Sequence, residues 1–300
     1  MIIGIIDLGS NTIRLSIYKY DASSFKLLTN KKTMAGIISY VDNGYLSDEG
    51  LDKICHILDS YKELLRNFDI HEVRCFSTAS LRLIKKRDEV LEKIAERTGI
   101  HIDLISGLKE AELDFIGTKL FLDVHEGIVI DIGGGSLELV SFMKDEIMDS
   151  FSLPIGSLSM YNRHVKGLIP TKKEKDEIKK DVITELDKIK NTSVMQKYFK
   201  VAVGVGGTIR ATLRLLNAKK KEEANYFKTE DVKELLDQIK DDNKESLSKI
   251  LKICPDRIHT IVPGMTVLYT VLKKADIEKV IVSKYGVREG YLYNEVIKGG

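Results

Sequence analysis

One stretch constrains the fold of this chain more than any other: residues 127–142, which read GIVIDIGGGSLELVSF. A short apolar run ends in Asp131, a triple glycine and a serine follow, and apolar residues then alternate with others. This pattern predicts a strand, a tight turn and a second strand. Successive N–H groups in a glycine turn can form an anion-binding concavity, because no side chain blocks the approach. The stretch therefore predicts a phosphate-binding loop, with a ligand-free hairpin as the alternative. The turn residues are Gly133, Gly134, Gly135 and Ser136.

A second copy of this pattern lies at the start of the chain. Residues 7–18 read DLGSNTIRLSIY and align with residues 131–142, so that Asp7 matches Asp131 and a glycine follows each aspartate at the same distance. A repeated unit predicts two similar half-molecules, although chance similarity of two hairpins is the alternative. If the halves face each other, both carboxylates and both turns converge on one cleft. Such a site suits Mg²⁺ with phosphate, and Asp7 and Asp131 are the predicted metal ligands, with Mn²⁺ as a second choice.

Composition narrows the class of protein. The 300 residues, 43% of them hydrophobic, can bury a large core and favour two domains. A formal net charge of +2 gives no signature of nucleic-acid or membrane binding. The three cysteines are scattered, which favours a reducing compartment, and we expect a cytoplasmic protein. The N-terminus reads as a strand, no apolar run approaches the roughly 20 residues of a membrane helix, and the histidines lack zinc-ligand spacing.

The first half of the chain alternates strands and helices. We expect strands over 2–6, 13–18, 26–28 and 34–40, a helix over 50–68 capped by residues 47–49, and strands over 72–76 and 100–105. Hydroxyl residues 77–78 and the basic stretch around Arg82 could grip phosphate, but for residues 85–87 a solvated helix face is favoured. Glu110 opens the next helix. It is either a helix-dipole cap or a base aimed into the cleft, and spacing does not choose between them.

The second half of the chain is richer in helix. Residues 171–191 predict an amphipathic helix whose charged residues form a solvated face. A strand over 199–205 leads into GVGGTIR, where Gly206, Gly207 and Thr208 open a helix. This turn either binds phosphate through its N–H groups or simply packs a helix closely on a strand. A charged helical region over 218–255, a helix over 265–272, a strand over 279–283 and a final helix complete an α/β fold.

At this point the sequence resembles the exopolyphosphatase/guanosine pentaphosphate phosphohydrolase (Ppx/GppA) family, within the actin–hexokinase–Hsp70 superfamily. The matching stretches occur in the family's order from end to end. They are DLGSNTIRL (7–15), STASLR (77–82), LISGLKEAELDFIG (104–117), DIGGGSLELV (131–140), VGVGGT (203–208), DRIHTIVPG (256–264) and SKYGVREG (283–290).

The resemblance implies two ribonuclease-H-like domains with an interdomain cleft, in the short two-domain form. Domain I would cover residues 1–122, with a last helix over about 287–300 returning to it. Domain II would cover 123–286 with helical insertions. The resemblance further implies Mg²⁺-dependent removal of terminal phosphate from inorganic polyphosphate or from guanosine pentaphosphate (pppGpp), and a homodimer.

The resemblance also assigns roles to particular residues. The family's catalytic glutamate falls on Glu110, and Glu138 falls on the acidic residue after the glycine loop. With Glu110 as the base, Asp7, Asp131 and Glu138 would hold the metal or its waters. The residues expected to bind phosphate are Gly9, Ser10, Asn11, Arg14, Arg82, Gly133, Gly134, Gly135, Ser136, Gly206, Gly207, Thr208 and Arg288.

Three departures from the family pattern affect substrate-binding positions. The double glutamate before alanine is Lys109-Glu110 here, the early Arg-Leu-Gly is Met34-Ala35-Gly36, and a common asparagine is Lys86. We therefore expect a polyphosphate hydrolase first, a pppGpp hydrolase second, and a non-hydrolytic phosphate- or nucleotide-binding regulator third. A kinase of the same superfamily is a further alternative.

Overall fold

The computed structural model describes residues 1–221, 223–240 and 244–299, and the chain divides into two compact units. Unit 1 comprises Met1–Glu110 and Tyr291–Gly300, and unit 2 comprises Ala111–Gly290. The boundary between the two units falls after Glu110, within helix α4 (Gly107–Lys119). The domain bounds implied by the resemblance, with a division near residue 122, stay a prediction. Residue 300 of the expected last helix, and residues 222 and 241–243 of the expected helical region, lie outside the described residues.

Unit 1 is built on a mixed sheet. In the described part of the chain its strand order is β3-β2-β1-β6-β7. Strands β1 and β2 run antiparallel, as do β2 and β3, whereas β6 runs parallel to β1 and β7. The strands are β1 (Ile2–Leu8), β2 (Thr12–Tyr20), β3 (Phe25–Met34), β6 (Val73–Ser77) and β7 (Ile102–Leu104), and a small separate ladder pairs β4 (Val41–Asp42) with β5 (Tyr45–Leu46).

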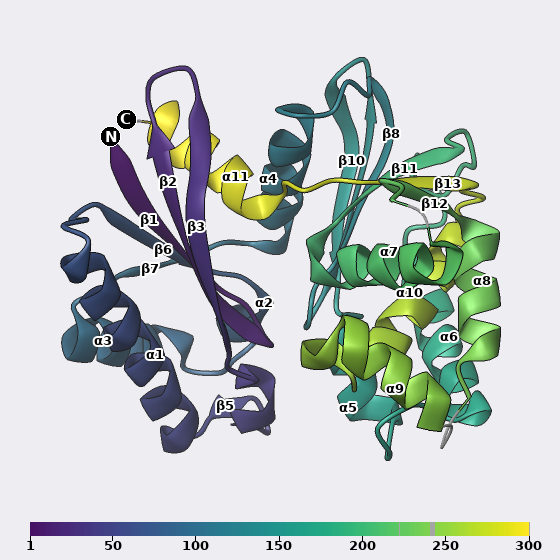
Figure 1. Cartoon of the computed structure of the whole chain (residues 1–300), viewed down its shortest axis with the longest axis horizontal. Helices are drawn as coiled ribbons and strands as arrows, with labels where there is room; N and C mark the ends of the chain where they lie inside the picture. Colours follow the sequence, from purple (N-terminus) through teal and green to yellow (C-terminus); the bar gives the residue numbers. More distant parts are fainter. Residues whose placement is uncertain (222, 241–243, 300) are drawn as a thin grey trace. The chain divides into compact units, whose positions relative to one another are not determined.

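Different segments cover the two faces of this sheet. Helices α1 (Asp48–Asn67) and α3 (Arg87–Thr98) pack together on one face, over residues such as Ile6 and Cys75 (Figure 1). The next strand residue points the other way, and there the Phe76 ring lies 4.6 Å from the ring of Tyr291. Tyr291 ends α11 (Val287–Tyr291), and a π-helical turn, Leu292–Ile297, follows it. The C-terminal segment of the chain is therefore part of the core of unit 1.

Local signals explain most helix starts of unit 1. The Ser47 side chain accepts a hydrogen bond from the Gly50 N–H at 3.2 Å and so caps α1, as its position before the helix predicts. The expected strand over 34–40 was wrong. Gly36 has a φ of 59°, in the left-handed region, and starts the short 3₁₀ helix η1 (Ile37–Tyr40). A glycine adopts this conformation at no steric cost, which ends the strand at Met34.

Unit 2 repeats the same architecture with additions. Its strand order in the described residues is β10-β9-β8-β11-β13-β12, and β8, β9 and β10 are antiparallel while β8, β11 and β13 are parallel. Reading β8 for β1 and β11 for β6, the first five positions match the order in unit 1, which confirms the internal repeat. The strands are β8 (Glu126–Ile132), β9 (Leu137–Met143), β10 (Glu146–Leu153), β11 (Val201–Val205), β12 (Tyr226–Lys228) and β13 (Lys279–Val282).

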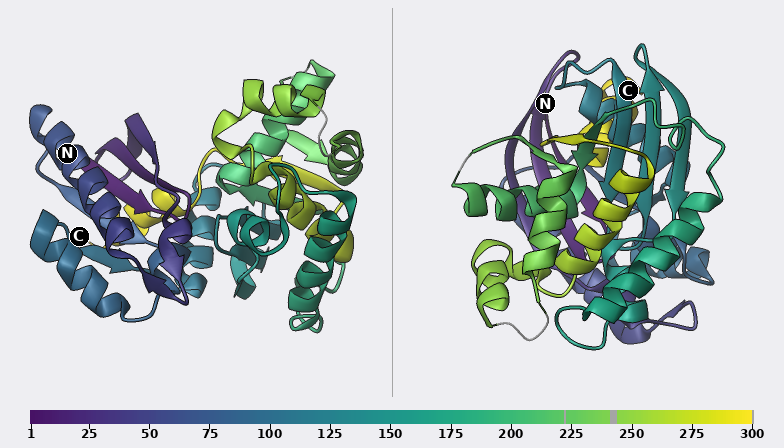
Figure 2. Two further views of the ribbon diagram at one scale, coloured as in Figure 1. Left: turned by 90° about the horizontal axis from the view of Figure 1, so that it is seen from below. Right: turned by 90° about the vertical axis from the view of Figure 1, so that its right-hand side faces the viewer.

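Helices cover both faces of the unit 2 sheet, so its central strands are buried on both sides. On one face, Ile128 and Ile130 face the larger helical layer (Figures 1 and 2). On the other face, Val129 belongs to one buried cluster with Phe115 of α4. The helical segments assigned to unit 2 are α5 (Ser157–His164), α6 (Lys172–Asp187), α7 (Gly206–Lys220), α8 (Thr229–Gln238), α9 (Lys244–Ile253), η2 (Pro255–Arg257) and α10 (Ile261–Lys274). Across the described ranges, no helix combines the length and apolar character needed to cross a bilayer.

Candidate functional site

The first glycine turn joins β1 to β2 in unit 1. The Gly9 N–H donates to the Thr12 carbonyl at 3.1 Å, which closes the turn. The Asn11 carbonyl accepts from the N–H groups of Ala35 and Gly36, at 3.0 and 2.9 Å. The Asn11 side-chain Nδ2 is buried and has no hydrogen-bond partner in the described part of the chain. A buried donor without a partner is costly, so Asn11 is well suited to bind an anion at this turn.

Two charged residues flank this first turn. Asp7 on β1 lies directly opposite Arg14 on β2 in the antiparallel register, so both side chains leave the same face of the sheet. Arg14 also donates from Nη1 to the Asn30 side chain at 3.2 Å. A carboxylate and a guanidinium therefore stand side by side at the end of the strands that hold the turn.

The second glycine turn joins β8 to β9 in unit 2 and has the same form. The Gly133 N–H donates to the Ser136 carbonyl at 3.0 Å, which matches the Gly9–Thr12 bond of the repeat. The carbonyls of Gly133 and Gly134 accept from the first N–H groups of α5. No backbone carbonyl of the described residues accepts from the N–H groups of Gly134, Gly135 or Ser136. These amides form the donor set that the glycine pattern predicts.

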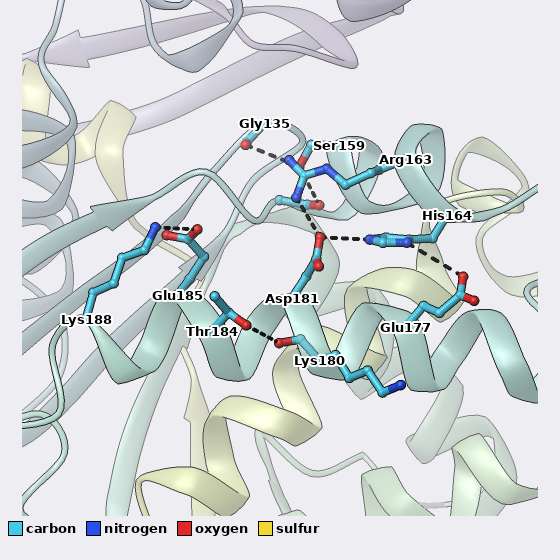
Figure 3. Close-up of polar contacts among 11 residues, drawn as sticks. Gly135, Ser159, Arg163, His164, Glu177, Lys180, Asp181, Thr184, Glu185 and Lys188 are labelled. Carbon is cyan, nitrogen blue, oxygen red and sulfur yellow. Dashed lines mark hydrogen bonds and ion pairs between the residues drawn. The ribbon is translucent and has the colours of Figure 1, made fainter.

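Helix α5 supports this second turn and is itself held by α6 (Figure 3). The Ser159 hydroxyl donates to the Gly135 carbonyl at 3.4 Å. One turn further along, Arg163 donates to Asp181 of α6 at 2.7 Å, and a His164 ring nitrogen lies 2.9 Å from the same carboxylate oxygen. Burial raises the pKa of Asp181, but the hydrogen bonds from Arg163 and His164 outweigh it and hold that pKa below its ordinary value.

Asp131 and Glu138 form a carboxylate pair beside the second turn. They lie directly opposite each other across β8 and β9 and are 8% and 1% exposed. The Ser152 hydroxyl donates to Glu138 Oε1 at 2.8 Å. Mg²⁺ is usually bound by one or two carboxylates with waters and substrate phosphates, and this pair fits that requirement. Among the described residues, no group of three or more His, Cys, Asp or Glu side chains is placed to hold a metal.

The N-terminus of α7 lies against Asp131. Gly206 has a φ of 77°, and a Cβ at this position would lie 1.8 Å from Asp131 Oδ1. No side chain caps the helix, and the buried hydroxyl of Thr208 has no partner among the residues that the structure describes. A side chain at Gly264 would lie 2.5 Å from Thr208 and 3.0 Å from Ser157, which donates to Gly133. The two glycine segments of unit 2 and Asp131 are thus neighbours.

Arginines complete this group of residues. A Cβ on Gly207 would lie 1.9 Å from a terminal nitrogen of Arg257, so that guanidinium covers the start of α7. Burial lowers the pKa of Arg210, and the charges of Arg288 and Arg257 lower it further, while Asp131 raises it. The candidate list missed Arg257 and Arg210. Arg257 lies within the family-like stretch DRIHTIVPG and Arg210 two residues after the stretch VGVGGT, but an arginine at either place carries no local signal of what it faces.

We call this group the unit 2 cluster. It consists of Asp131, residues 133–136, Glu138, residues 206–208 and Arg257. It combines a carboxylate pair, backbone donors from two segments and a guanidinium, which together suit a phosphate group with a divalent cation.

Glu110 and Arg82 meet in unit 1. Glu110 is 6% exposed, in the first turn of α4, and its carboxylate accepts a hydrogen bond from Arg82 Nη1 at 2.9 Å. The same Arg82 nitrogen donates to the Ile105 carbonyl at 3.3 Å. An adjacent guanidinium favours the ionised form of a carboxylate, which is the form that accepts a proton. Arg82 thus forms an ion pair with Glu110. The expected binding of phosphate by Arg82 remains a prediction.

Neighbouring hydroxyl and basic residues have structural partners. Ser77 and Ser80 donate to the Leu8 carbonyl at 3.1 and 2.8 Å, which anchors the end of β1. Lys86 is exposed, precedes α3 in the left-handed conformation and pairs with Glu89 at 3.2 Å. The solvated helix start expected for residues 85–87 is therefore confirmed at Lys86.

Comparison with known proteins identifies the family. The sequence profile of the Ppx/GppA phosphatases matches residues 16–298. This chain belongs to the Ppx/GppA phosphatase family. It is 23% identical over 304 residues to "Exopolyphosphatase 1" of Mycobacterium leprae, covering 99% of this chain and 90% of that protein. The fold matches an exopolyphosphatase from Cytophaga hutchinsonii with a TM-score of 0.86 at 23% identity, covering 100% of this chain and 98% of the other. It also matches the Ppx/GppA member of Aquifex aeolicus with a TM-score of 0.79 at 26% identity, covering 100% and 99%.

Two departures from the Ppx/GppA pattern now have a structural setting. Lys109 lies 3.2 Å from Glu295 in an ion pair within unit 1, so the reversed charge has a local partner. Met34 lies opposite Thr12 in the β2–β3 register, and its side chain is 42% exposed. An arginine at that position would lie beside the first turn, and the methionine offers no charge there.

Proposed function

We propose that this Ppx/GppA protein is an exopolyphosphatase, which hydrolyses the terminal phosphate of inorganic polyphosphate with Mg²⁺ or Mn²⁺. The observation that carries the proposal is the ion pair between Glu110 and Arg82, 2.9 Å apart and largely buried. The guanidinium holds this buried carboxylate in a fixed orientation, as a group that must receive a proton from a positioned water requires, whereas a simple helix cap needs no such partner. This favours the catalytic interpretation of Glu110 over the cap.

In the proposed reaction, Glu110 accepts a proton from water as the water oxygen bonds to the terminal phosphorus. The bond from that phosphorus to the bridging oxygen breaks, and the shortened chain leaves with the electron pair. Backbone amides at residues 9–11, 133–136 and 206–208 would bind phosphate oxygens, with help from Arg14, Arg257 and Arg288. The proposal requires that residues of both units act on one substrate.

The cation would be held by Asp131 and Glu138, with Asp7 as a further carboxylate. When bound, it would neutralise charge on the phosphoryl group and on the leaving oxygen. Asp131 and Glu138 lie on the two strands that the second turn connects. Replacing them by the similarly shaped Asn and Gln therefore tests the role of their charge.

Polyphosphate is the preferred substrate because the candidate groups recognise charge alone. The proposed donors are amides and guanidinium groups, which bind phosphate oxygens and do not distinguish a nucleoside. The names of the Mycobacterium leprae and Cytophaga hutchinsonii relatives agree with this choice. Hydrolysis of pppGpp is the second candidate, since its terminal phosphate presents the same chemistry. A homodimer in the cytoplasm is part of the proposal and is testable by sedimentation and fractionation.

The direct test is phosphate release with Mg²⁺ from long polyphosphate, tripolyphosphate and pppGpp, compared as kcat/KM. We expect the highest value for long polyphosphate. Release from pppGpp alone would show that pppGpp, the second candidate, is the substrate. Binding of all three without release would contradict hydrolysis and leave a phosphate-binding regulator. Phosphoryl transfer to ADP or to a sugar would instead indicate a kinase.

A further inference from the structure

A pocket of unit 2, separate from the unit 2 cluster, is lined by lysines. It has a volume of about 280 Å³ and lies among α6, α8 and α10. We call it the lysine pocket. No residue of the unit 2 cluster lines it. Its lining is Lys172, Lys175, Asp176, Lys179, Lys233, Leu236, Asp237, Ile239, Lys240, Thr266 and Tyr269.

The charge around the lysine pocket is unbalanced among the described residues. Five lysines and two aspartates line it. Lys172, Lys175 and Lys179 are three and four residues apart, which places them on one face of α6. The sequence pattern indicated only a solvated helix face here. The structure instead shows that α8 and α10 close this face into a pocket.

Hydrogen bonds hold two of these lysines in place. Lys175 donates to the Ile239 carbonyl at 3.2 Å, which joins α6 to the end of α8. Lys179 donates to Asp176 at 2.9 Å, and this bond, reinforced by the charge of Lys172, lowers the pKa of Asp176. The Lys233 ammonium lies 4.0 Å from the Glu230 carboxylate, which is farther than the Lys179–Asp176 distance. Ammonium groups gathered around one cavity repel each other, and an anion carrying several charges would relieve that repulsion.

Helix α10 connects the lysine pocket to the unit 2 cluster. Thr266 and Tyr269 of α10 line the pocket. Gly264, two residues earlier on the same helix, packs against Thr208 of the unit 2 cluster. An anion bound in the pocket would therefore contact the helix on which Thr208 rests.

We propose that the lysine pocket is a second phosphate site, which binds a compact group of linked phosphates. Lysine is a flexible point charge that binds phosphate well, and several of them favour a multiply charged anion over a single phosphate. The choice of linked phosphates rests on the proposed function, since the anion available to such an enzyme is its own substrate. The linked phosphates can belong to an inorganic chain or to a nucleotide, and the experiment separates these sources.

The test is lysine acetylation read by mass spectrometry, on the Glu110→Gln variant so that the ligand is not consumed. The probes are inorganic tripolyphosphate, ATP and sulfate. We expect tripolyphosphate to slow acetylation of Lys172 and Lys233 several-fold, and to leave the exposed lysines Lys144 and Lys190 unchanged. Protection by tripolyphosphate alone supports an inorganic chain, and equal protection by ATP supports any linked phosphates. Equal labelling of pocket and control lysines, or equal protection by sulfate, would overturn the proposal.

A charge-reversal pair gives a second readout. The variant Lys172→Glu/Lys233→Glu should bind tripolyphosphate at this site about tenfold more weakly than the matched variant Lys144→Glu/Lys190→Glu. Circular dichroism checks that both remain folded, and a Lys233→Ala variant replaces the pair if they do not. Hydrolysis by the wild type is measured in parallel. If polyphosphate is hydrolysed but the pocket lysines are not protected from acetylation, only this inference is contradicted. If the lysines are protected but no hydrolysis occurs, only the proposed function is contradicted.

Discussion

Asp131 and Glu138 face each other across neighbouring antiparallel strands, both almost fully buried. At the equivalent place of the repeat, Asp7 faces Arg14. The same cross-strand position therefore carries two anions in unit 2 and an anion with a cation in unit 1. Two buried carboxylates repel each other unless a positive charge lies nearby. This difference is the reason for assigning the metal first to Asp131 and Glu138.

The carboxylate pair predicts a specific metal dependence. We expect a chelator to abolish phosphate release and Mg²⁺ or Mn²⁺ to restore it. Asp131→Asn and Glu138→Gln should each raise the Mg²⁺ concentration for half-maximal activity by about tenfold or more. Glu146→Gln, on the exposed part of β10, is the matched control and should titrate like the wild type. Unchanged metal titrations in both variants would contradict this assignment.

Replacing Gly206 or Gly133 by alanine should reduce stability by different amounts. Gly206→Ala forces a Cβ against Asp131 and a positive φ of 77°, so we expect a stability loss of roughly 1–3 kcal/mol and loss of activity. In Gly133→Ala the nearest atom, the Ser136 carbonyl oxygen, is 3.4 Å away, and the expected loss is below about 1 kcal/mol. Urea unfolding measures both. A larger loss for Gly133→Ala than for Gly206→Ala would be incompatible with the described geometry.

The Lys109–Glu295 pair predicts a charge-swap result. Lys109→Glu restores the double glutamate of the family pattern but places two carboxylates together, so we expect about 0.5–1 kcal/mol of destabilisation. The double variant Lys109→Glu/Glu295→Lys should recover most of this loss, because it restores opposite charges. A double-mutant cycle by denaturant unfolding measures the coupling. Additive effects of the two changes would show that the ion pair contributes nothing.

His259 predicts how stability depends on pH. Burial lowers its pKa below the ordinary value of 6.5, and the charge of Arg257 lowers it further. Below pH 6.5 the unfolded chain then binds a proton that the folded protein does not. The free energy of unfolding should therefore fall as the pH drops through 6.5, until the folded pKa is reached. His259→Gln should flatten this part of the profile. An equally steep fall in the variant would place the effect on another group.

The repeat was readable from the sequence because its turns depend on local spacing. The pattern of Asp, Gly and hydroxyl residue at 7–12 and 131–136 predicted two hairpins, and both turns close with the same hydrogen bond. The Ser47 cap and the amphipathic helix α6 were also predicted, since caps and apolar periodicity are local. Features that depend on a few neighbouring residues could thus be predicted from the sequence.

Features that depend on distant residues were not accessible. The contact of Arg82 with Glu110 was not predicted, because it joins residues 28 positions apart. Arg257 was missed, because only the fold brings it over Gly207. The lysines of α6 read as a solvated face, since nothing in residues 171–191 indicates that α8 and α10 close over them.

The central claim is that Glu110 activates water for hydrolysis of polyphosphate. The most direct test measures phosphate release from long polyphosphate with Mg²⁺ for the wild type, Glu110→Gln and the matched control Glu112→Gln, which changes a less buried carboxylate of the same helix. We predict a fall of roughly 10²–10⁴ in kcat for Glu110→Gln, and a control rate close to the wild type. A Glu110→Gln rate equal to the wild type, with the fold intact, would contradict the account.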